Sequence, residues 1–306
     1  MVKLNKKIIL PGGAGLVGQN LVARLFSKGF SDIVVIDKHA ANLEKLKRVQ
    51  PNITAILADL AEPGIWQNSF DRADCVVVLQ AQIGGNNYLE FVRNNIDSTQ
   101  IIINTIKKYN IRNVIHISSS VVESFSEDYY TETKKNQERL FVESGIMCLI
   151  LRPTLMFGRF DRKHLGWLAH FMIRIPLFPI PGNGKFLRQP LYVGDFCNVI
   201  ISCIEGNIKN GTFNITGLEE IDYIDIIRAI KSSVKAKTII IKIPYPLFYF
   251  LLWIWGLLDK TPPFTTQQLS ALVANDKFEL IDWPKIFNVT YTPFAEAIKE
   301  TFCHSV

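Results

Sequence analysis

Short apolar runs alternate with segments of helical spacing along the first half of the chain. The run Ile8-Ile9-Leu10 leads into a glycine-rich turn at residues 12–18, and apolar residues then recur at helical spacing as far as Gly29. A second apolar run, residues 33–36, ends at Asp37. A strand, a glycine turn, a helix and a second strand that ends in an acid are typical of a unit that binds a dinucleotide.

The alternation continues through four more apolar runs, each of which leads into a turn or a polar residue. These are residues 55–58 before Asp59, 75–79 before Gln80, 114–117 before Ser118 and 148–151 before Arg152. Near-continuous apolar strands separated by helices predict a parallel sheet that is covered on both faces. Ligands of such sheets bind beyond the carboxyl ends of the strands, so the residues that follow the runs are candidates for one shared site.

We therefore predict an α/β fold: a Rossmann-type, doubly wound parallel sheet with a smaller C-terminal lobe that binds the substrate. The sheet domain is expected over residues 1–158, with return segments near residues 185–220. The rhythm of strands and helices loosens from about residue 159, so residues 159–306 are expected to form most of the substrate lobe.

Composition and charge narrow the classes of partner. Of 306 residues, 48% are hydrophobic and 20% are charged, as in a folded soluble protein, and the net charge is +6. The basic residues are scattered and form no run with interleaved aromatics, so no nucleic-acid partner is predicted. The net positive charge is explained either by an ordinary solvated surface or by attraction to an acidic partner. The five cysteines lack metal-binding spacing, so we predict no metal site. We also predict reduced thiols in a cytoplasmic protein, and no secretory signal.

The glycine turn and the acid that ends the second run support a cofactor hypothesis. The glycines let the backbone approach a pyrophosphate at the N-terminus of a helix. Asp37 would accept hydrogen bonds from the adenosine ribose and repel a 2′-phosphate, which favours NAD. The neighbouring Lys38 leaves NADP as the alternative.

Tyr130 and Lys134 are the candidate acid–base pair. They lie four residues apart, on one face of a predicted helix, ten residues after the triplet Ser118-Ser119-Ser120. The unperturbed pKa of tyrosine is about 10, and a lysine one turn away favours the phenolate. Such a pair can move a proton on and off an alcohol while a cofactor moves a hydride. The spacing alone arises easily by chance, so the surrounding motifs decide its meaning.

Together these segments resemble the extended short-chain dehydrogenase/reductase family, which includes nucleotide-sugar epimerases, dehydratases and ketoreductases. The likeness runs essentially from end to end. It covers the glycine motif, with proline in place of the usual threonine, an Asp-Leu pair, a helix asparagine, the serine motif, YxxxK and several later segments. These are residues 11–18, 59–60, 79–81, Asn95, 118–120, 130–134 with Glu138, 151–158, 189–195 and 211–215.

The resemblance implies a role for individual residues. Tyr130 would be the acid–base, Lys134 would hold the nicotinamide ribose while lowering the tyrosine pKa, and Ser120 would hydrogen-bond the reacting oxygen. Substrate contact is implied for Ser120, Arg159 and Arg188, because arginine forks suit a diphosphate. The residues implied to bind the cofactor are Gly12, Gly15, Leu16, Val17, Gly18, Asp37, Lys38, Asp59, Leu60, Gln80, Ala81, Ser118, Tyr130, Lys134, Pro153 and Thr154.

The loop between the serines and the tyrosine bears on the type of reaction. The stretch from Ser120 to Tyr130 is shorter than in most sugar epimerases, and the acid pair of a dehydratase would have to come from Glu123, Glu127 and Asp128. A dehydratase is therefore disfavoured, while an epimerase and a ketoreductase both stay open. Glu123 is interpreted as a solvated loop carboxylate, with an extra acid or base as the alternative.

Ile243–Leu258 is the most unusual segment, with sixteen residues that carry no charge. It is shorter than the roughly 20 apolar residues that span a bilayer. A helix that is apolar all round is usually buried, so a place in the core or at a dimer contact is one interpretation. A peripheral contact with the inner face of the membrane, with Trp253 and Trp255 near the interface, is the other.

The predicted function is that of an NAD-dependent enzyme, an epimerase or ketoreductase, which acts on a nucleotide-diphosphate sugar through a keto intermediate and works as a homodimer. If Ile243–Leu258 touches the membrane, a lipid-linked sugar becomes the alternative substrate. A non-catalytic, cofactor-binding structural subunit is a further hypothesis, and the intact Tyr130 and Lys134 argue against it.

Overall fold

The computed structural model describes residues 4–124, 128–206, 208–258, 266–273 and 279–302, and leaves the side chains of residues 4, 5, 267, 268 and 271 undescribed. The chain divides into two compact units. The first comprises Met1–Thr154, Val193–Ile215 and Leu280–Tyr291, and the second comprises Leu155–Tyr192, Thr216–Glu279 and Thr292–Val306. Each unit is therefore assembled from three separate segments of the sequence.

The first unit is built on a seven-stranded sheet with the strand order β11-β6-β5-β4-β1-β2-β3. All neighbouring strands run parallel, as the apolar runs predict. The direction of winding reverses between β1 and β4, which is where doubly wound sheets bind ligands. The predicted Rossmann-type fold is confirmed. The strands are β1 (Leu4–Pro11), β2 (Phe30–Asp37), β3 (Thr54–Leu57), β4 (Cys75–Val78), β5 (Val114–Ile117), β6 (Cys148–Pro153) and β11 (Gly211–Ile215).

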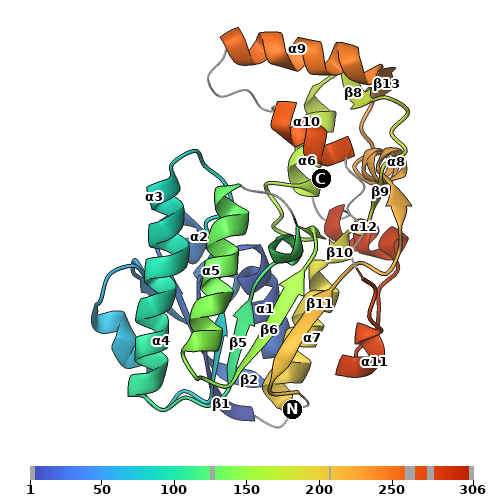
Figure 1. Ribbon diagram of the computed structural model, residues 1–306. Helices are drawn as coiled ribbons and strands as arrows, with labels where there is room; N and C mark the ends of the chain where they lie inside the picture. The colour runs from blue at the N-terminus through green and yellow to red at the C-terminus, as the bar shows by residue number, and fades with distance from the viewer. Residues whose placement is uncertain (1–3, 125–127, 207, 259–265, 274–278, 303–306) are drawn as a thin grey trace. The chain divides into compact units, whose positions relative to one another are not determined.

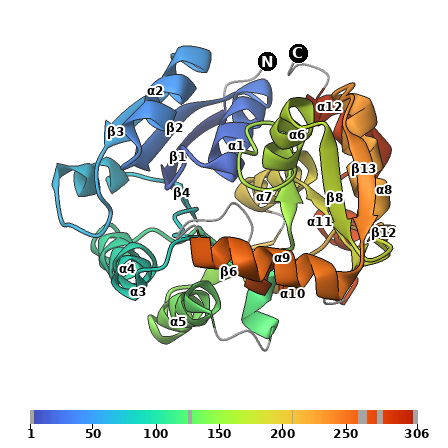
Figure 2. The ribbon, with the colours of Figure 1, turned by 90° about the horizontal axis from the view of Figure 1, so that it is seen from above.

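Helices cover both faces of this sheet. They are α1 (Leu16–Ser27), α2 (Ala40–Val49), α3 (Tyr88–Phe91), α4 (Ser98–Lys108), α5 (Tyr129–Glu143), α7 (Val193–Glu205), α11 (Trp283–Phe287) and the short 3-10 helices η1 (Ile65–Phe70) and η3 (Ser120–Glu123). Figures 1 and 2 show α3, α4 and α5 on one face, and α1, α2 and α7 on the other. Every residue of β4 and β5 is buried as a result.

The helix after β4 is interrupted by a π-helical turn, η2 (Val92–Asp97), between α3 and α4. Asn95 lies in this turn and has no exposed surface. Its side chain accepts a hydrogen bond of 2.7 Å from the backbone of Gln82 and donates one of 2.9 Å to Thr133 on α5. Single π-turns occur frequently at functional sites. Here the turn joins the loop after β4 to the helix that carries Tyr130.

The second unit contains three small two-stranded sheets: β7 with β10, β9 with β12, and β8 with β13. The helix α8 contacts both α6 and α12. The elements are β7 (Met156–Phe157), α6 (Leu165–Arg174), β8 (Leu177–Pro181), β9 (Leu187–Arg188), β10 (Leu191–Tyr192), β12 (Ile221–Asp222), α8 (Tyr223–Ser233), β13 (Ile239–Ile243), α9 (Tyr245–Leu258), α10 (Thr266–Val273) and α12 (Phe294–Phe302).

Helix α9 contains most of the uncharged segment singled out in the sequence, and it is largely exposed. Phe248 and Leu252 are buried against Leu269 of α10. Eight other large apolar residues of α9 are exposed, from 41% at Tyr249 to 84% at Leu258. The interpretation that this segment lies in the core of its own chain is therefore wrong. In the part of the chain that the structure describes, no helix is long and apolar enough to cross a membrane.

Candidate active site

The glycine turn lies against the loop that follows β4. Gly12 has a φ of +76°, and a Cβ atom there would lie 2.4 Å from the backbone of Gln80. A Cβ atom at Gly18 would lie 2.1 Å from the carbonyl oxygen of Gly13. Any larger residue at these two positions would push the turn, the first helix and the β4 loop apart. Gly12 therefore lets the end of β1 lie against the loop after β4, and Gly18 lets α1 lie against the glycine turn.

The N-terminus of α1 has the features of an anion site. Gly15 is the N-cap and provides no side-chain acceptor, and the first turn carries no acidic residue. A Cβ atom on Gly15 would have only one neighbour within 4 Å, the carbonyl oxygen of Gly12 at 3.6 Å. The N-terminus of α1 therefore has free space beside Gly15, where a pyrophosphate of NAD could approach the N–H groups of Leu16 and Val17. The residues present fit this cofactor.

Asp37 ends β2 and holds the glycine turn. Its two carboxylate oxygens accept hydrogen bonds from the backbone N–H groups of Ala14, at 3.0 Å, and His39, at 2.9 Å. Each oxygen keeps a second lone pair that could accept from a ribose hydroxyl. Lys38 is exposed, and its amine donates a hydrogen bond of 2.6 Å to Asn94 on the π-turn.

The Asp-Leu pair after β3 is already engaged within the protein. Asp59 accepts hydrogen bonds from the guanidinium of Arg93 and from the backbone of Ala61 at 3.0 Å. Burial opposes ionisation of this carboxyl, but these hydrogen bonds outweigh it and lower the pKa of Asp59. The side chain of Leu60 is buried in the core, so the group it could offer to a cofactor is its backbone.

Two buried polar atoms at the carboxyl edge of the sheet have no hydrogen-bond partner among the residues that the structure describes. Gln80 donates a hydrogen bond of 3.1 Å to Thr99, but its side-chain oxygen has none to accept. The hydroxyl of Ser118 is likewise unpaired, although its backbone N–H donates to Leu151. Buried polar atoms are normally satisfied, so these two indicate a missing ligand at this edge. The neighbouring Ala81 is exposed.

Ser119 is the serine whose side chain hydrogen-bonds the phenol of Tyr130. It is also the N-cap of η3. Ser120, which the sequence analysis named, is the first residue of η3 and is buried. Sequence reasoning missed Ser119, because three consecutive serines carry no signal that distinguishes their directions.

Lys134 is fully buried and is held by two acceptors. Its amine donates to the carbonyl oxygen of Ile117 at 2.9 Å and to the side chain of Gln137 at 2.6 Å. Gln137 in turn donates a hydrogen bond of 2.8 Å to Thr99, which also binds Gln80. This buried chain of polar groups links helix α5 to α4 and to the end of β4. No sequence motif points to the roles of Gln137 and Thr99.

Burial shifts the pKa of both members of the candidate acid–base pair. Burial lowers the pKa of Lys134 to about 7, and the nearby carboxylate of Glu138 only partly offsets this. Burial also raises the pKa of Tyr130, and the hydrogen bond from Ser119 works in the opposite direction. The amine of Lys134 donates to Ile117 and Gln137 in this structure. Its effect on the tyrosine pKa stays a prediction.

Glu123 is an exposed carboxylate, as predicted, and it also belongs to an ion-pair network. Arg152 binds Glu138 through two nitrogens, at 2.9 and 2.6 Å, and binds Glu123 at 2.7 Å. Asn214 on β11 donates two further hydrogen bonds to Glu123. This network fixes η3, and with it Ser119, to strands β6 and β11.

The remaining predicted residues fall in both units. Pro153 and Thr154 are buried, and the backbone of Thr154 donates to Ile215. Arg159 and Arg188 belong to the second unit. The guanidinium of Arg159 lies 5.3 Å from the ring centroid of Phe160, and that of Arg188 donates to the backbone oxygens of its neighbour Leu187 and of Leu272. Their contact with a diphosphate stays a prediction.

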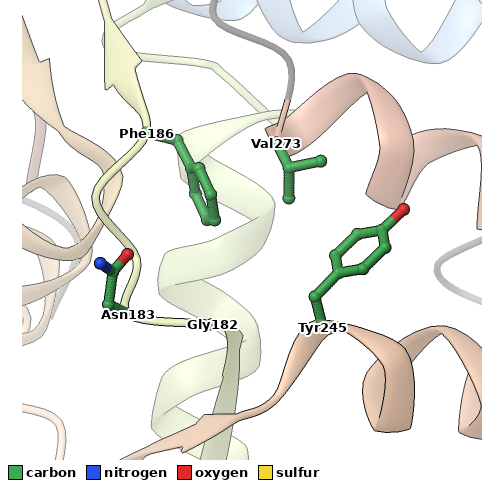
Figure 3. A pocket seen from close by; sticks show the side chains of 5 residues that line it. All are labelled: Gly182, Asn183, Phe186, Tyr245 and Val273. Atoms are coloured by element: carbon green, nitrogen blue, oxygen red, sulfur yellow. The ribbon is translucent and has the colours of Figure 1, made fainter.

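The second unit also has a pocket of its own, with a volume of about 420 Å³. It is lined by Gly182, Asn183 and Phe186 from the turn after β8, by Tyr245 at the start of α9 and by Val273 at the end of α10. Figure 3 shows the rings of Phe186 and Tyr245 and the side chain of Val273 around this hollow. Its lining is mostly apolar, so it suits a hydrocarbon or aromatic group.

A sequence model of the NAD dependent epimerase/dehydratase family matches residues 8–216. The chain belongs to this family. Relatives in the NAD dependent epimerase/dehydratase family include dTDP-glucose 4,6-dehydratase of Escherichia coli, 22% identical over 272 residues, which cover 73% of this chain and 75% of that protein. The sterol-4-alpha-carboxylate 3-dehydrogenase (decarboxylating) of Mus musculus is 24% identical over 280 residues, with 83% and 75% covered.

The fold agrees with solved structures. The crystal structure of UDP-glucose 4-epimerase from Thermotoga maritima with UDP-glucose has a TM-score of 0.77, with 16% identity and 98% of each chain covered. The predictions of an extended short-chain dehydrogenase/reductase fold, of an NAD-dependent enzyme and of NAD as the cofactor of its family are confirmed. Family members act on several nucleotide sugars and by several reactions, so the family by itself does not select a substrate.

Proposed function

We propose that the chain oxidises an alcohol of a sugar carried by a nucleotide diphosphate, with NAD as the hydride acceptor and Tyr130 as the base. The observation that carries this proposal is the placement of Tyr130 and the buried Lys134 one turn apart on α5, with Ser119 acting on the pKa of the Tyr130 phenol. The glycine turn, Asp37 and these three residues all belong to the first unit, around the carboxyl edge of its sheet. Membership of the NAD dependent epimerase/dehydratase family supports this proposal.

Protons and electrons balance in the proposed reaction. Bound NAD supplies a hydride acceptor. The step needs Tyr130 in its phenolate form, which burial disfavours. In that form Tyr130 would take the proton of the substrate hydroxyl, the alcohol would become a ketone, and the hydride would carry two electrons to bound NAD. Ser119 donates a hydrogen bond to the reacting oxygen. Return of the hydride to the opposite face gives an epimer, and a single transfer gives a dehydrogenase or ketoreductase.

A dehydratase is disfavoured by the surroundings of the loop carboxylates. Glu123 is bound by Arg152 and Asn214. Asp128 is the N-cap of α5, and its two oxygens accept hydrogen bonds from the backbone and hydroxyl of Thr131. Glu127 lies outside the described residues. Carboxylates that serve as a clamp and as a helix cap are poorly placed to add and remove protons during an elimination.

The proposal assigns a role to each unit. The first binds NAD, and the second binds the nucleotide sugar, with Arg159 and Arg188 as diphosphate contacts. Arg188 donates hydrogen bonds to backbone carbonyls, which fixes the direction of its guanidinium. The assembly of the enzyme as a homodimer belongs to the same proposal.

A lipid-linked sugar is the second candidate substrate. It is favoured by the exposed apolar surface of α9 and by the apolar pocket at Tyr245. Both features belong to the second unit, to which the proposal assigns substrate binding.

Two measurements test the proposed function. Small molecules that co-purify with the protein are identified by mass spectrometry, and titration with NAD⁺ and NADP⁺ is followed by calorimetry. We expect bound NAD(H) or micromolar NAD⁺ affinity, and weaker NADP⁺ affinity because Asp37 repels a 2′-phosphate. Absence of any dinucleotide binding would contradict the cofactor assignment. Turnover is then assayed on UDP-, dTDP- and ADP-sugars and on a polyprenyl-diphosphate sugar, and oxidation of none of them would contradict the substrate class.

A further inference from the structure

Helix α9 carries no charged side chain, yet most of its large side chains are exposed to solvent. Its 14 residues, YPLFYFLLWIWGLL, contain no charged side chain, and its exposed residues include Phe250, Trp253, Trp255 and Leu257, all at least 47% exposed. Exposed apolar patches larger than a few hundred Å² mark interaction sites on soluble proteins. The helix therefore has a partner that the isolated chain lacks.

The exposed residues are spread too widely for a flat protein partner. At 3.6 residues per turn, the positions from Tyr249 through Trp253 and Leu257 to Trp255 take up roughly two thirds of the helix circumference. One packed protein face covers a stripe of roughly 100°. A lipid interface is a solvent and can surround the exposed part of the helix.

The side of α9 turned toward the protein is already covered. Phe248 and Leu252 pack on Leu269 of α10, with Tyr245 and Val273 at the margin of the same cluster. Figure 2 shows α9 and α10 next to each other. Interfacial helices usually keep a charged face of their own toward water. Because α10 takes the place of that face, α9 can be apolar on all its remaining sides.

The length of α9 fits a helix that lies in the interface plane. Fourteen residues span about 21 Å, which is short of the roughly 30 Å hydrocarbon core of a bilayer. Tyr249, Trp253 and Trp255 are about half exposed, and Tyr and Trp favour the level of the lipid headgroups. The helix can therefore lie along the membrane surface, but cannot cross it.

Positive charge flanks the start of the helix. Lys242 is exposed three residues before Tyr245, the pocket residue at the start of α9, and Lys185 is exposed in the turn that lines the same pocket. The backbone of Gly182 in that turn donates a hydrogen bond of 2.7 Å to Ile243. Lysines beside an apolar helix attract anionic headgroups by about 1 kcal/mol each. Charge complementarity therefore selects an anionic lipid surface.

We propose that α9 is an interfacial helix that binds the second unit to an anionic lipid bilayer, with Lys242 and Lys185 at the headgroups. The apolar pocket at Tyr245 continues this surface and gives space for part of a hydrocarbon chain. This proposal does not depend on the proposed reaction, and it would bring a lipid-linked substrate to the enzyme.

Co-flotation of the full-length protein with vesicles tests the proposal without substrate or NAD. The vesicles are phosphatidylcholine alone, or phosphatidylcholine with one quarter phosphatidylglycerol. We expect the protein to float with the anionic vesicles, and to float less with neutral vesicles or in 0.5 M salt. Lack of flotation with anionic vesicles would overturn the proposal, and equal flotation with both would overturn the role of the lysines.

The double substitution Phe250→Glu and Trp253→Glu changes only exposed positions of α9. It should lower the vesicle partition coefficient at least about tenfold while leaving the circular dichroism spectrum unchanged. Ile65→Glu is the matched control, because Ile65 is 87% exposed in the first unit, and it should float like the parent. Flotation of the double variant at the parental level would contradict a lipid-binding α9.

Sedimentation analysis separates a bilayer from a second copy of the chain as the partner. If α9 binds lipid, the double variant keeps the oligomeric state of the parent. If the variant dissociates while flotation is unchanged, α9 is a contact between copies and the proposal is wrong. The variant Tyr130→Phe should float normally, so the reaction and the lipid contact are tested separately.

Discussion

The buried amine of Lys134 donates a hydrogen bond of 2.6 Å to the side-chain oxygen of Gln137, three residues further along α5. The partner is a neutral amide, so it orients the amine without supplying the negative charge that would keep it protonated. Glu138 is the nearby carboxylate, but its oxygens bind Arg152. The pKa of Lys134 therefore falls to about 7, and its charge is set close to neutral pH.

This low pKa makes stability depend on pH. Between pH 7 and 10.5 the unfolded chain keeps a proton on Lys134 that the folded chain releases, so this group makes the free energy of unfolding rise with pH. Lys134→Met removes the effect. We expect the difference in unfolding free energy between parent and variant to change by up to about 4 kcal/mol from pH 7 to 10, in favour of the parent at high pH. Urea unfolding at a series of pH values measures it, and a constant difference would contradict the low pKa.

Gln137→Glu should weaken the rise of stability with pH while changing the shape of the side chain very little. A carboxylate beside the amine stabilises the charged form, so the pKa of Lys134 rises and the gain in stability between pH 7 and 10 becomes smaller. The same urea series reports the slope. Gln100→Glu is the control, because position 100 is exposed on α4 and the substitution adds the same charge in water. Equal slopes in the parent and in Gln137→Glu would mean that Gln137 does not set the charge of Lys134.

A matched pair of substitutions tests which of the two candidate serines has the catalytic role. Ser119→Ala removes the hydroxyl that binds Tyr130, and we expect kcat to fall by about 100-fold. Ser120→Ala removes a buried hydroxyl from the next position, and we expect a change of less than about fivefold. Steady-state kinetics on the substrate identified by the screen decides between them. A larger loss for Ser120→Ala would return the catalytic role to that residue.

Tyr130→Phe tests the acid–base assignment. Without the phenol no side chain at this position can accept the substrate proton, so kcat should fall by at least about 1000-fold. The affinity for NAD, measured by calorimetry, should change by less than about threefold, because the ring and its packing remain. Activity near the parental level would show that another group carries the proton.

Glu123→Gln distinguishes a clamp from a catalytic acid. The clamp role predicts a loss of about 0.5–1 kcal/mol in unfolding free energy, because Arg152 keeps its paired contact with Glu138 and the site is partly exposed. The clamp role also predicts that both limbs of the pH profile of kcat are unchanged in the variant. If a limb of that profile disappears in the variant, Glu123 takes part in proton transfer.

The layout of the first unit follows from the sequence because apolar runs and glycines act locally. Runs such as residues 75–78 are buried on both faces, which requires a parallel sheet with helices on each side. Asp37 and the glycine turn come at the ends of such runs, so their shared edge could be predicted without coordinates. The family assignment then rests on motifs with fixed spacing.

Other parts of the site depend on contacts that a linear pattern does not encode. The direction of Ser119 is decided by the turn into η3, and the partner of Lys134 by the packing of α5 against Thr99 of α4. Glu123 meets Arg152 and Asn214 across the sheet, from positions 29 and 91 residues away. The exposure of α9 could not be predicted either, because an uncharged helix has the same sequence in a core and at a membrane.

The carboxylate of Asp37 holds the backbone of Ala14 in the glycine turn and also faces the predicted ribose position. Cofactor choice and turn geometry therefore share one side chain. A substitution at residue 37 that admits the extra phosphate of NADP also releases the turn that positions the pyrophosphate. An engineered change of cofactor in this enzyme consequently needs a second substitution that restores a hydrogen-bond acceptor for residue 14, and single variants at Asp37 should weaken binding of both dinucleotides.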